Sequence, residues 1–339
     1  MTEPGEQVLA AAPARTGFAY AVDRLKLLAA AAAVPVALLP FARLHWVADL
    51  ATPFVPQYLF AAAVFTAVFA AAGDRRWRNG AGLVFVAVAL LWGRPAFAPT
   101  GVAETDGPRV RLLSTNVLTS NRDGGAFLDL VRRSQPDVIV ALEVDRRWAA
   151  TLEGLAAEYP FRRVVPRDDN FGIALLSRYE LADLTTVMHD GVPVIRATVE
   201  TATPFTLFAR HPLPPVGAEN WRSRNRHLED LAVETAAADC PVVVAGDLNL
   251  PPWSPFFRDL LREGRLCDSR RSLSVFDADG TWPAPLWPFW PLRTPIDHVL
   301  HTRDVATVSR RLGADIGSDH LPVLVELALP GPVEAGQAE

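Results

Sequence analysis

The segment from Pro241 to Asn249, with the sequence PVVVAGDLN, constrains the fold more strongly than any other part of the chain. Its run of β-branched and small apolar residues predicts a strand that is buried on both faces. The run ends in Asp247 and Asn249, and a carboxylate at the edge of an apolar core must be hydrogen-bonded, paired or bound to a metal. The segment therefore indicates either a functional site at a strand end or an ordinary Asx turn.

Five further strand-like runs also carry polar side chains at or beside one end. These runs lead to Asn116, to Glu143, to Arg210 and His211, to Asp297 and His298, and to Asp319 and His320. Carboxylates, amides and imidazoles are the side chains that bind metals and phosphates. Their recurrence at six strand ends favours a functional site over six unrelated turns.

The order of these motifs resembles the endonuclease/exonuclease/phosphatase superfamily, whose fold is like that of deoxyribonuclease I. The resemblance covers roughly residues 108–329, and its strongest signals are GDLN and SDH. The motifs, in order, are TNV, LEV, NFGIALLSR, RHPLPP, GDLN, IDHVL and SDHLPV. One departure is Leu118, which stands where some DNA-repair members carry an acid. That difference counts against a second metal contact and against a repair nuclease.

The expected architecture of residues 101–330 is a four-layer α/β sandwich of two mixed β-sheets with outer helices. Many consecutive strands are too close together for crossover helices, which favours mixed sheets packed face to face, and the resemblance implies the same fold. Helices are expected at 124–134 with Asp123 as N-cap, from Asp145 to 158, at 220–239 and at 254–263. Residues 331–339 are expected to form a disordered tail.

Residues 1–100 are rich in Ala, Val, Leu and Phe and carry fewer charges than the rest of the chain. They are expected to form a membrane region with about three transmembrane helices. The apolar runs are 27–42, 54–72 and 81–92. A helix needs about 20 apolar residues, with roughly 17 as the lower limit, to cross a bilayer. Only the second run reaches this length alone. A signal peptide followed by a hairpin, or an interfacial third segment, are the alternatives.

The basic residues predict a cytoplasmic N-terminus if the cluster before the first run dominates. The loop after the first run is poor in basic charge, whereas the loop after the second contains Arg75, Arg76 and Arg78. Three crossings would then place the catalytic domain outside the cytoplasm, and two would place it inside. The expected location is a multi-pass protein of the cell membrane with an extracytoplasmic catalytic domain.

The resemblance implies a hard divalent cation, Mg²⁺ with Mn²⁺ as an alternative, held by oxygen ligands. Glu143 is the expected direct ligand, with Asn116 beside it and Asp319 completing the network. The residues do not indicate whether the site holds one metal ion or two.

The resemblance also assigns the catalytic roles. Asp247 would orient or deprotonate the attacking water, and Asn249 would hold that water or the phosphate. His320 would donate to a phosphoryl oxygen, with Asp297 fixing its tautomer. The remaining expected phosphate-binding residues are His211, which is also a candidate proton donor, and Asn170.

Neighbouring residues are expected to be structural. Arg210 and His298 should point to the opposite face of their strands from the motif residues beside them, and Arg224 is expected on a solvated helix face rather than in an anion clamp. Cys240 and Cys267 would lie near each other, either as a disulfide or as two buried thiols.

The segment 281–292 contains three Trp, one Phe and four Pro residues, which exclude a regular helix or central strand. Three interpretations of this segment, which precedes Asp297, are open. It would lie at the rim of the site and rest on a bilayer, pack on the protein as a rigid loop, or stack on nucleic-acid bases. Residues 101–339 contain 25 Arg and no Lys against 33 Asp and Glu, a net charge of −8. This acidic balance weighs against a nonspecific nuclease.

The sequence therefore predicts a membrane-anchored, metal-dependent phosphoesterase that hydrolyses a phosphodiester or phosphomonoester by water attack. Its expected partners are a lipid-like or nucleic-acid phosphoester and the membrane, with no obligate protein partner. The alternatives are an extracytoplasmic DNA or RNA nuclease and a non-catalytic binding or scaffold module. A binding module has no chemical need for Glu143, Asp247, Asn249, Asp297 and His320 together.

Overall fold

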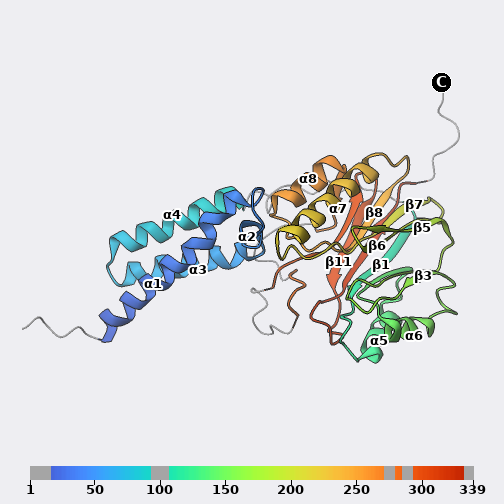
Figure 1. The fold of residues 1–339 in the computed structure, drawn as a ribbon, viewed down its shortest axis with the longest axis horizontal. Coiled ribbons are helices and arrows are strands. Elements are labelled where there is room, and N and C mark those ends of the chain that lie inside the picture. The colour runs from blue at the N-terminus through green and yellow to red at the C-terminus, as the bar shows by residue number, and fades with distance from the viewer. Residues whose placement is uncertain (1–16, 93–106, 271–278, 285–292, 332–339) are drawn as a thin grey trace, which may run out of the picture.

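The computed structural model describes residues 17–92, 107–270, 279–284 and 293–331 of the 339-residue chain. A helical arm formed by the N-terminal residues adjoins a sandwich of sheets and helices (Figure 1). The predicted tail at 332–339 lies outside the described residues, as do residues 285–292 of the aromatic and proline-rich segment.

The first sheet has six strands in the order β11-β12-β1-β2-β4-β3. Strands β1 and β2 are parallel, and the other neighbours are antiparallel. Its strands are β1 (Arg109–Asn116), β2 (Val138–Leu142), β3 (Phe161–Val165), β4 (Ile173–Ser177), β11 (Ala306–Leu312) and β12 (Val323–Ala328).

The second sheet also has six strands, in the order β5-β6-β7-β8-β10-β9. Strands β7 and β8 are its parallel pair. Its strands are β5 (Leu181–His189), β6 (Val192–Val199), β7 (Phe205–Ala209), β8 (Val242–Asp247), β9 (Leu266–Asp268) and β10 (Asp297–Thr302).

Alternating side chains on the central strands build the layers. In β8, Val243 and Ala245 point into the core between the two sheets, whereas Val242 and Val244 pack under helices α7 (Ala218–Ala236) and α8 (Pro255–Glu263). The first sheet is covered in the same way by α5 (Gly124–Ser134) and α6 (Arg146–Glu153). The central strands are therefore buried on both faces, and the arrangement confirms the predicted four-layer sandwich of mixed sheets.

Local signals set most element boundaries correctly. The carboxylates of Asp123 and Asp145 accept from the backbone N–H groups of Ala126 and Trp148, so both act as the predicted N-caps. The second helix ends at Glu153 rather than residue 158, because Gly154 begins a series of turns. The short strands β3 and β9 were not predicted, since neither shows a long apolar run.

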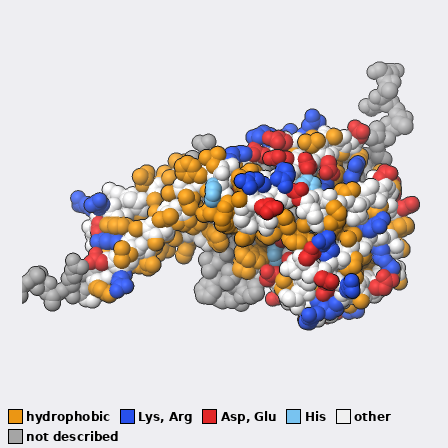
Figure 2. Space-filling model, in the orientation of Figure 1, with side chains coloured by type: hydrophobic (Ala, Val, Ile, Leu, Met, Phe, Trp, Pro, Cys, Tyr) orange, Lys and Arg blue, Asp and Glu red, His pale blue; other side chains and the backbone are white. Residues whose placement is uncertain are grey.

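The helical arm contains three long helices, α1 (Gly17–Leu38), α3 (Val55–Ala71) and α4 (Arg75–Trp92). Residues 39–54, here called the α1–α3 connector, include η1 (Leu39–Phe41), the single-turn helix α2 (Trp46–Asp49) and η2 (Thr52–Phe54). Apolar side chains cover much of the arm (Figure 2). By length and composition, the two segments Tyr20–Phe41 and Trp46–Ala71 are long and apolar enough to cross a membrane.

The α1–α3 connector is packed against the sandwich. Arg224 of α7 is 1% exposed and forms an ion pair with Asp49 of the connector, which is 2% exposed. The expectation that Arg224 lies on a solvated helix face is therefore wrong, because the connector covers that part of α7. Trp253 donates from its indole nitrogen to the carbonyl oxygen of Thr52 and packs in one cluster with Val88 of α4.

The two cysteines are free thiols in this structure. The Sγ atom of Cys240 lies 3.1 Å from the hydroxyl of Thr206 on the adjacent strand, and Cys267 lies in β9 opposite His301. Burial raises the pKa of the Cys267 thiol above its ordinary value. Of the two alternatives left by the sequence, the structure contains the pair of thiols.

Candidate active site

The two parallel strand pairs bring distant motifs to the same end of the sandwich. Asn116, the last residue of β1, lies opposite Leu142 in β2, so Glu143 follows beside it. In the second sheet, Ala209 lies opposite Ala245, and Asp247 lies opposite Asp297 in the antiparallel strand β10. Because the carboxyl ends of parallel strands meet at one edge, side chains far apart in sequence converge there.

Gly246 allows the two strands β7 and β8 to approach at this edge. Its φ is 151°, and a Cβ atom on it would lie only 1.9 Å from the carbonyl oxygen of Arg210. No other residue type fits without moving the backbone. The glycine thus keeps His211, the next residue after Arg210, beside Asp247, with 3.6 Å between His211 Nε2 and Asp247 Oδ2.

Glu143 is held by its neighbours at the end of β2. Its Oε1 accepts from the side-chain amide of Asn116 at 2.9 Å, and its Oε2 accepts from the backbone N–H of Thr119 at 3.2 Å. The Asn116 Nδ2 atom also lies 3.5 Å from Asp247 Oδ2. Glu143 adopts φ 61°, a left-handed conformation that is uncommon for a residue with a Cβ and is found at functional sites.

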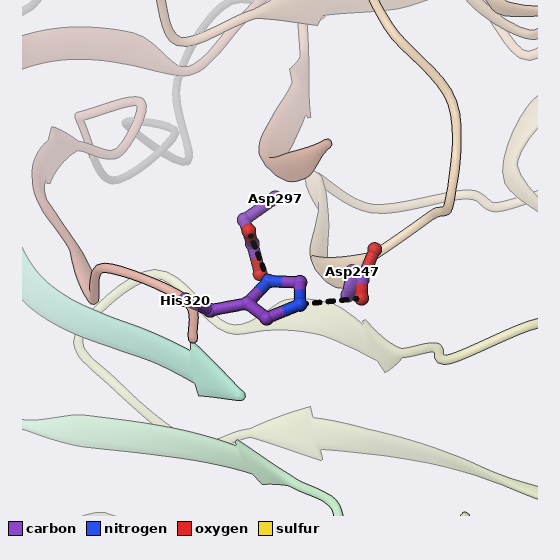
Figure 3. A group of neighbouring side chains, drawn as sticks. All are labelled: Asp247, Asp297 and His320. Atoms are coloured by element: carbon purple, nitrogen blue, oxygen red, sulfur yellow. Dashed lines mark hydrogen bonds and ion pairs between the residues drawn. The ribbon is translucent and has the colours of Figure 1, made fainter. Parts of the chain in front are cut away.

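Asp247, Asp297 and His320 form a buried group (Figure 3). His320 Nδ1 lies 2.9 Å from Asp297 Oδ2, and its Nε2 points toward Asp247 Oδ2 at 3.7 Å. The first contact is a hydrogen bond, whereas the second is too long for one. Asp297 therefore orients the imidazole and leaves Nε2 directed into the site.

Burial and charge set different protonation states within this group. Burial lowers the pKa of His320, but the charges of Asp297 and Asp247 and the hydrogen bond to Asp297 outweigh it and raise this pKa to about 10. Burial, reinforced by the negative charges of Asp297 and Glu143, raises the pKa of Asp247 to about 7. Burial favours protonation of Asp297, yet the charge of His320 holds the Asp297 pKa below its ordinary value. At neutral pH His320 is thus a cation paired with an ionised Asp297.

His211 differs from His320 although both rings face Asp247. Burial, with the charge of His320 as the second cause, lowers the pKa of His211 to about 4, so this ring is neutral at physiological pH. The ring of Phe171 packs against it at 5.3 Å between centroids. A neutral and a cationic imidazole therefore flank one carboxylate.

Asn249 is positioned by the turn after β8. Its backbone N–H donates to Asp247 Oδ1 at 2.9 Å, and its side-chain amide donates to the carbonyl oxygen of Pro212 at 3.0 Å. Its φ is 52°. The predicted residue Asn170 lines the same cleft from the turn before β4.

Asp319 also lines this cleft. Its Oδ2 accepts from the indole N–H of Trp282 at 3.1 Å, and its Oδ1 is buried with no hydrogen-bond partner among the described residues. An unpartnered buried carboxylate oxygen and the carboxylate of Glu143 suit a hard divalent cation. Asn116 is less available as a metal ligand in this structure, because its amide oxygen accepts from the backbone N–H of Leu118 at 3.0 Å. It orients Glu143 in this arrangement.

Most of these residues line one cleft with a volume of about 590 Å³, namely Glu143, Asn170, His211, Asp247, Asn249, Asp319 and His320. Three residues to which the sequence assigned no individual role help to build it. Thr119 and Ser318 hold Glu143 and the Asn116 backbone, and Trp282 holds Asp319. Ser318 is part of the SDH motif, whereas the positions of Thr119 and Trp282 follow from loop packing.

Arg210 and His298 contact other parts of the protein, as expected for structural residues. Arg210 forms an ion pair with Glu234 at 2.6 Å. The Nε2 atom of His298 lies 2.8 Å from the carbonyl oxygen of Leu250. Neither side chain lines the cleft described above.

A model of the Endonuclease/Exonuclease/phosphatase family matches residues 113–320, which is more than half of the chain. The chain belongs to the endonuclease/exonuclease/phosphatase family. The match begins in β1 and ends at His320, so it includes the whole set of converging strand ends. Enzymes of this family hydrolyse phosphoester bonds with divalent metal ions, and this chain is a hydrolase of that class.

Solved structures share the fold. An endonuclease/exonuclease/phosphatase from Bacteroides vulgatus is 19% identical, with a TM-score of 0.55 and coverage of 66% of this chain and 99% of that chain. One from Beutenbergia cavernae is 23% identical, with a TM-score of 0.54 and coverage of 66% and 72%. The human nocturnin catalytic domain is 18% identical, with a TM-score of 0.53 and coverage of 68% and 99%. No curated protein matches the chain significantly.

Proposed function

We propose that this chain is a membrane-anchored hydrolase that uses a divalent cation, Mg²⁺ or Mn²⁺, to cleave a phosphodiester or phosphomonoester. The observation that carries the proposal is the group in which an ionised Asp297 orients a cationic His320 toward Asp247. The cationic imidazole of His320 lies beside the carboxylate of Asp247, whose pKa is raised to about 7. The two side chains therefore provide an acid and a base in one site.

The proton movements follow from these states. Asp247, when ionised, accepts a proton from the attacking water, and Asn249 holds the phosphate or that water in line. His320 donates a hydrogen bond from Nε2 to a phosphoryl oxygen, where negative charge grows in the transition state. Neutral His211 serves as a second phosphate contact or as proton donor to the leaving oxygen, and Asn170 contributes a further phosphate contact.

The cation would be held by Glu143, with Asp319 and Asn116 completing the oxygen donors. Asn116 can ligate once its amide oxygen turns away from the Leu118 N–H. A bound divalent cation neutralises phosphate charge and lowers the pKa of bound water. The protein residues orient the substrate and move the protons around that site.

A lipid-like phosphoester is the favoured substrate class, and nucleic acid is the rival. The net charge of −8 over residues 101–339 repels a polyanion rather than attracting it. A single phosphoester carries little charge, so it approaches without needing a basic surface.

We further propose that α1, α3 and α4 cross the membrane and leave the catalytic domain outside the cytoplasm. Lys26 of α1 pairs with Asp74 at 3.0 Å, whereas Val88 of α4 packs with Trp253 of the catalytic domain. The basic residues Arg75, Arg76 and Arg78 thus lie at the end of the arm opposite the catalytic domain, and basic ends face the cytoplasm. A phosphatase reporter fused after residue 331 should be active only if this orientation is correct.

The direct test is hydrolysis of 4-nitrophenyl ethyl phosphate by the full chain in detergent. Activity should require added Mg²⁺, disappear with a chelator and return on re-addition. Asp247→Ala should remove it, whereas Asp129→Ala should retain it because the Asp129 side chain is 54% exposed on α5. Turnover that survives in Asp247→Ala, or that ignores the chelator, would refute the mechanism.

A further inference from the structure

The cleft extends beyond the catalytic residues into a part with an apolar lining, here called the apolar arm of the cleft to distinguish it from the helical arm. The apolar lining includes Leu50, Pro53 and Phe54 from the α1–α3 connector and residues 213–216 in the loop after β7. The catalytic end and the apolar arm belong to one continuous cleft of about 590 Å³. A segment of the helical arm therefore borders the same space as Asp247 and His320.

An arginine fixes the position of the connector relative to the turn that carries Asn249. Arg224 pairs with Asp49 through one guanidinium nitrogen and donates through Nη1 to the carbonyl oxygen of Asn249 at 3.1 Å. Both charged side chains are almost fully buried. Because one arginine joins the connector to the turn that carries Asn249, the wall formed by Leu50 and Phe54 keeps a defined position relative to the catalytic groups.

The apolar arm is open and continues onto an apolar surface. Phe54 is 41% exposed and Val216 is 62% exposed at the cleft. Phe41 and Leu44, on the connector where α1 ends, are 52% and 73% exposed. Apolar side chains run from the helical arm to its junction with the catalytic domain (Figure 2). Contiguous exposed apolar side chains of this kind mark membrane or ligand contact.

We infer that the α1–α3 connector is part of the substrate-binding site and that the apolar arm receives the hydrocarbon portion of an amphiphilic phosphoester. The inference rests on the proposed phosphoester hydrolysis and assigns its substrate class. The phosphate lies at Asp247 and His320, and the hydrocarbon chain lies between the connector and residues 213–216. The bilayer in which the arm is embedded supplies such a substrate to the same end of the molecule.

Two substrates that differ only in chain length test this assignment. 4-Nitrophenyl ethyl phosphate and 4-nitrophenyl dodecyl phosphate have the same charge and leaving group. The wild-type chain, at one fixed detergent concentration, should show a higher kcat/KM for the dodecyl ester. Phe54→Ala should lower the ratio of the two kcat/KM values by about tenfold, through lost apolar contact in KM.

Matched variants separate binding from a general effect of the substitution. Phe41→Ala removes a partly exposed phenyl ring from the same connector outside the cleft, and it should leave the ratio unchanged. Val216→Asn, which changes the lining contributed by the loop after β7, should lower the ratio as Phe54→Ala does. Equal rates for both esters in the wild type, or equal losses in Phe54→Ala and Phe41→Ala, would overturn the inference.

The outcomes also distinguish this inference from the proposed function. Turnover of the ethyl ester without any preference for the dodecyl ester would leave the hydrolase intact and remove the apolar arm as a hydrocarbon site. Turnover of neither ester would refute phosphodiester hydrolysis and, with it, the hydrocarbon site. Cleavage of single-stranded DNA in preference to both esters would assign Phe54 to base stacking and overturn the hydrocarbon assignment.

Discussion

The two ends of the cleft are built differently. The catalytic end consists of side chains at strand ends of two sheets. Asn116, Asp247, Asp297 and His320 are buried there, and hydrogen bonds join Asn116 to Glu143 and His320 to Asp297. The apolar arm consists of loop residues from two separate regions, with side chains such as Phe54 and Val216 partly open to solvent. Sheet edges thus fix the reacting groups, whereas the junction between regions determines which molecule can lie beside them.

The largest effect is expected at the catalytic end. His320→Ala removes the hydrogen bond to the phosphoryl oxygen and leaves Asp297 without its charged partner, so kcat should fall by about 10²- to 10⁴-fold. The loss should be the same for the ethyl and dodecyl esters, because both present the same phosphate. Steady-state kinetics with the two esters measures this loss. A loss confined to one ester would show that the two ends of the cleft do not act independently.

The next effect is expected at the ion pair that joins the ends. Arg224→Met leaves Asp49 buried without a partner and should lower the free energy of unfolding by about 3–5 kcal/mol. The double variant Asp49→Leu/Arg224→Met removes both charges and should recover most of this loss. Thermal unfolding in detergent gives the comparison.

Arg262→Met provides the matched control, since Arg262 pairs with Asp259 but its side chain is 69% exposed. Its unfolding midpoint should change little, because exposed ion pairs contribute about 0–1 kcal/mol. A double variant as unstable as Arg224→Met would show that the connector depends on some contact other than the ion pair.

The smallest expected effect is the pH dependence. Asp247 accepts a proton only when ionised, and its pKa is raised to about 7, so kcat/KM should fall about tenfold per pH unit below pH 7. The basic limb should appear as His320, whose pKa is raised to about 10, loses its proton. His211, with its pKa lowered to about 4, should add no limb between these values.

A divalent cation near Glu143 stabilises the ionised form of Asp247, so higher Mg²⁺ should move the acid limb to lower pH. The dodecyl-to-ethyl ratio should stay constant across the profile, because both esters carry the same single charge. Rates that rise as the pH falls below 7 would exclude Asp247 as the base.

The catalytic end was predictable because its information is local and periodic. Each of Asn116, Glu143, Asp247 and His320 follows or borders a strand-like run, and parallel strands bring such ends to one edge. The sequence order of the motifs then resembled one family. The same reasoning predicted the two sheets, the outer helices and the Asp123 and Asp145 caps.

The junction was not predictable from the same signals. Asp49 and Arg224 are 175 positions apart, and neither lies in a motif. The pattern of α7 predicts an apolar face, but it does not show that another region covers part of its polar face. Trp282 was expected in a rim loop, yet its contact with Asp319 depends on loop packing that has no period in the sequence.

The buried pairing of Arg224 with Asp49 determines which fragment of the chain can be handled in water. A polypeptide beginning at residue 107 would lose the Asp49 carboxylate and the packing partners of Trp253, and it would present an uncompensated guanidinium and a bare indole to solvent. Soluble production of the catalytic region therefore requires redesign of the junction with the connector, with Arg224 and Trp253 as the first positions to change.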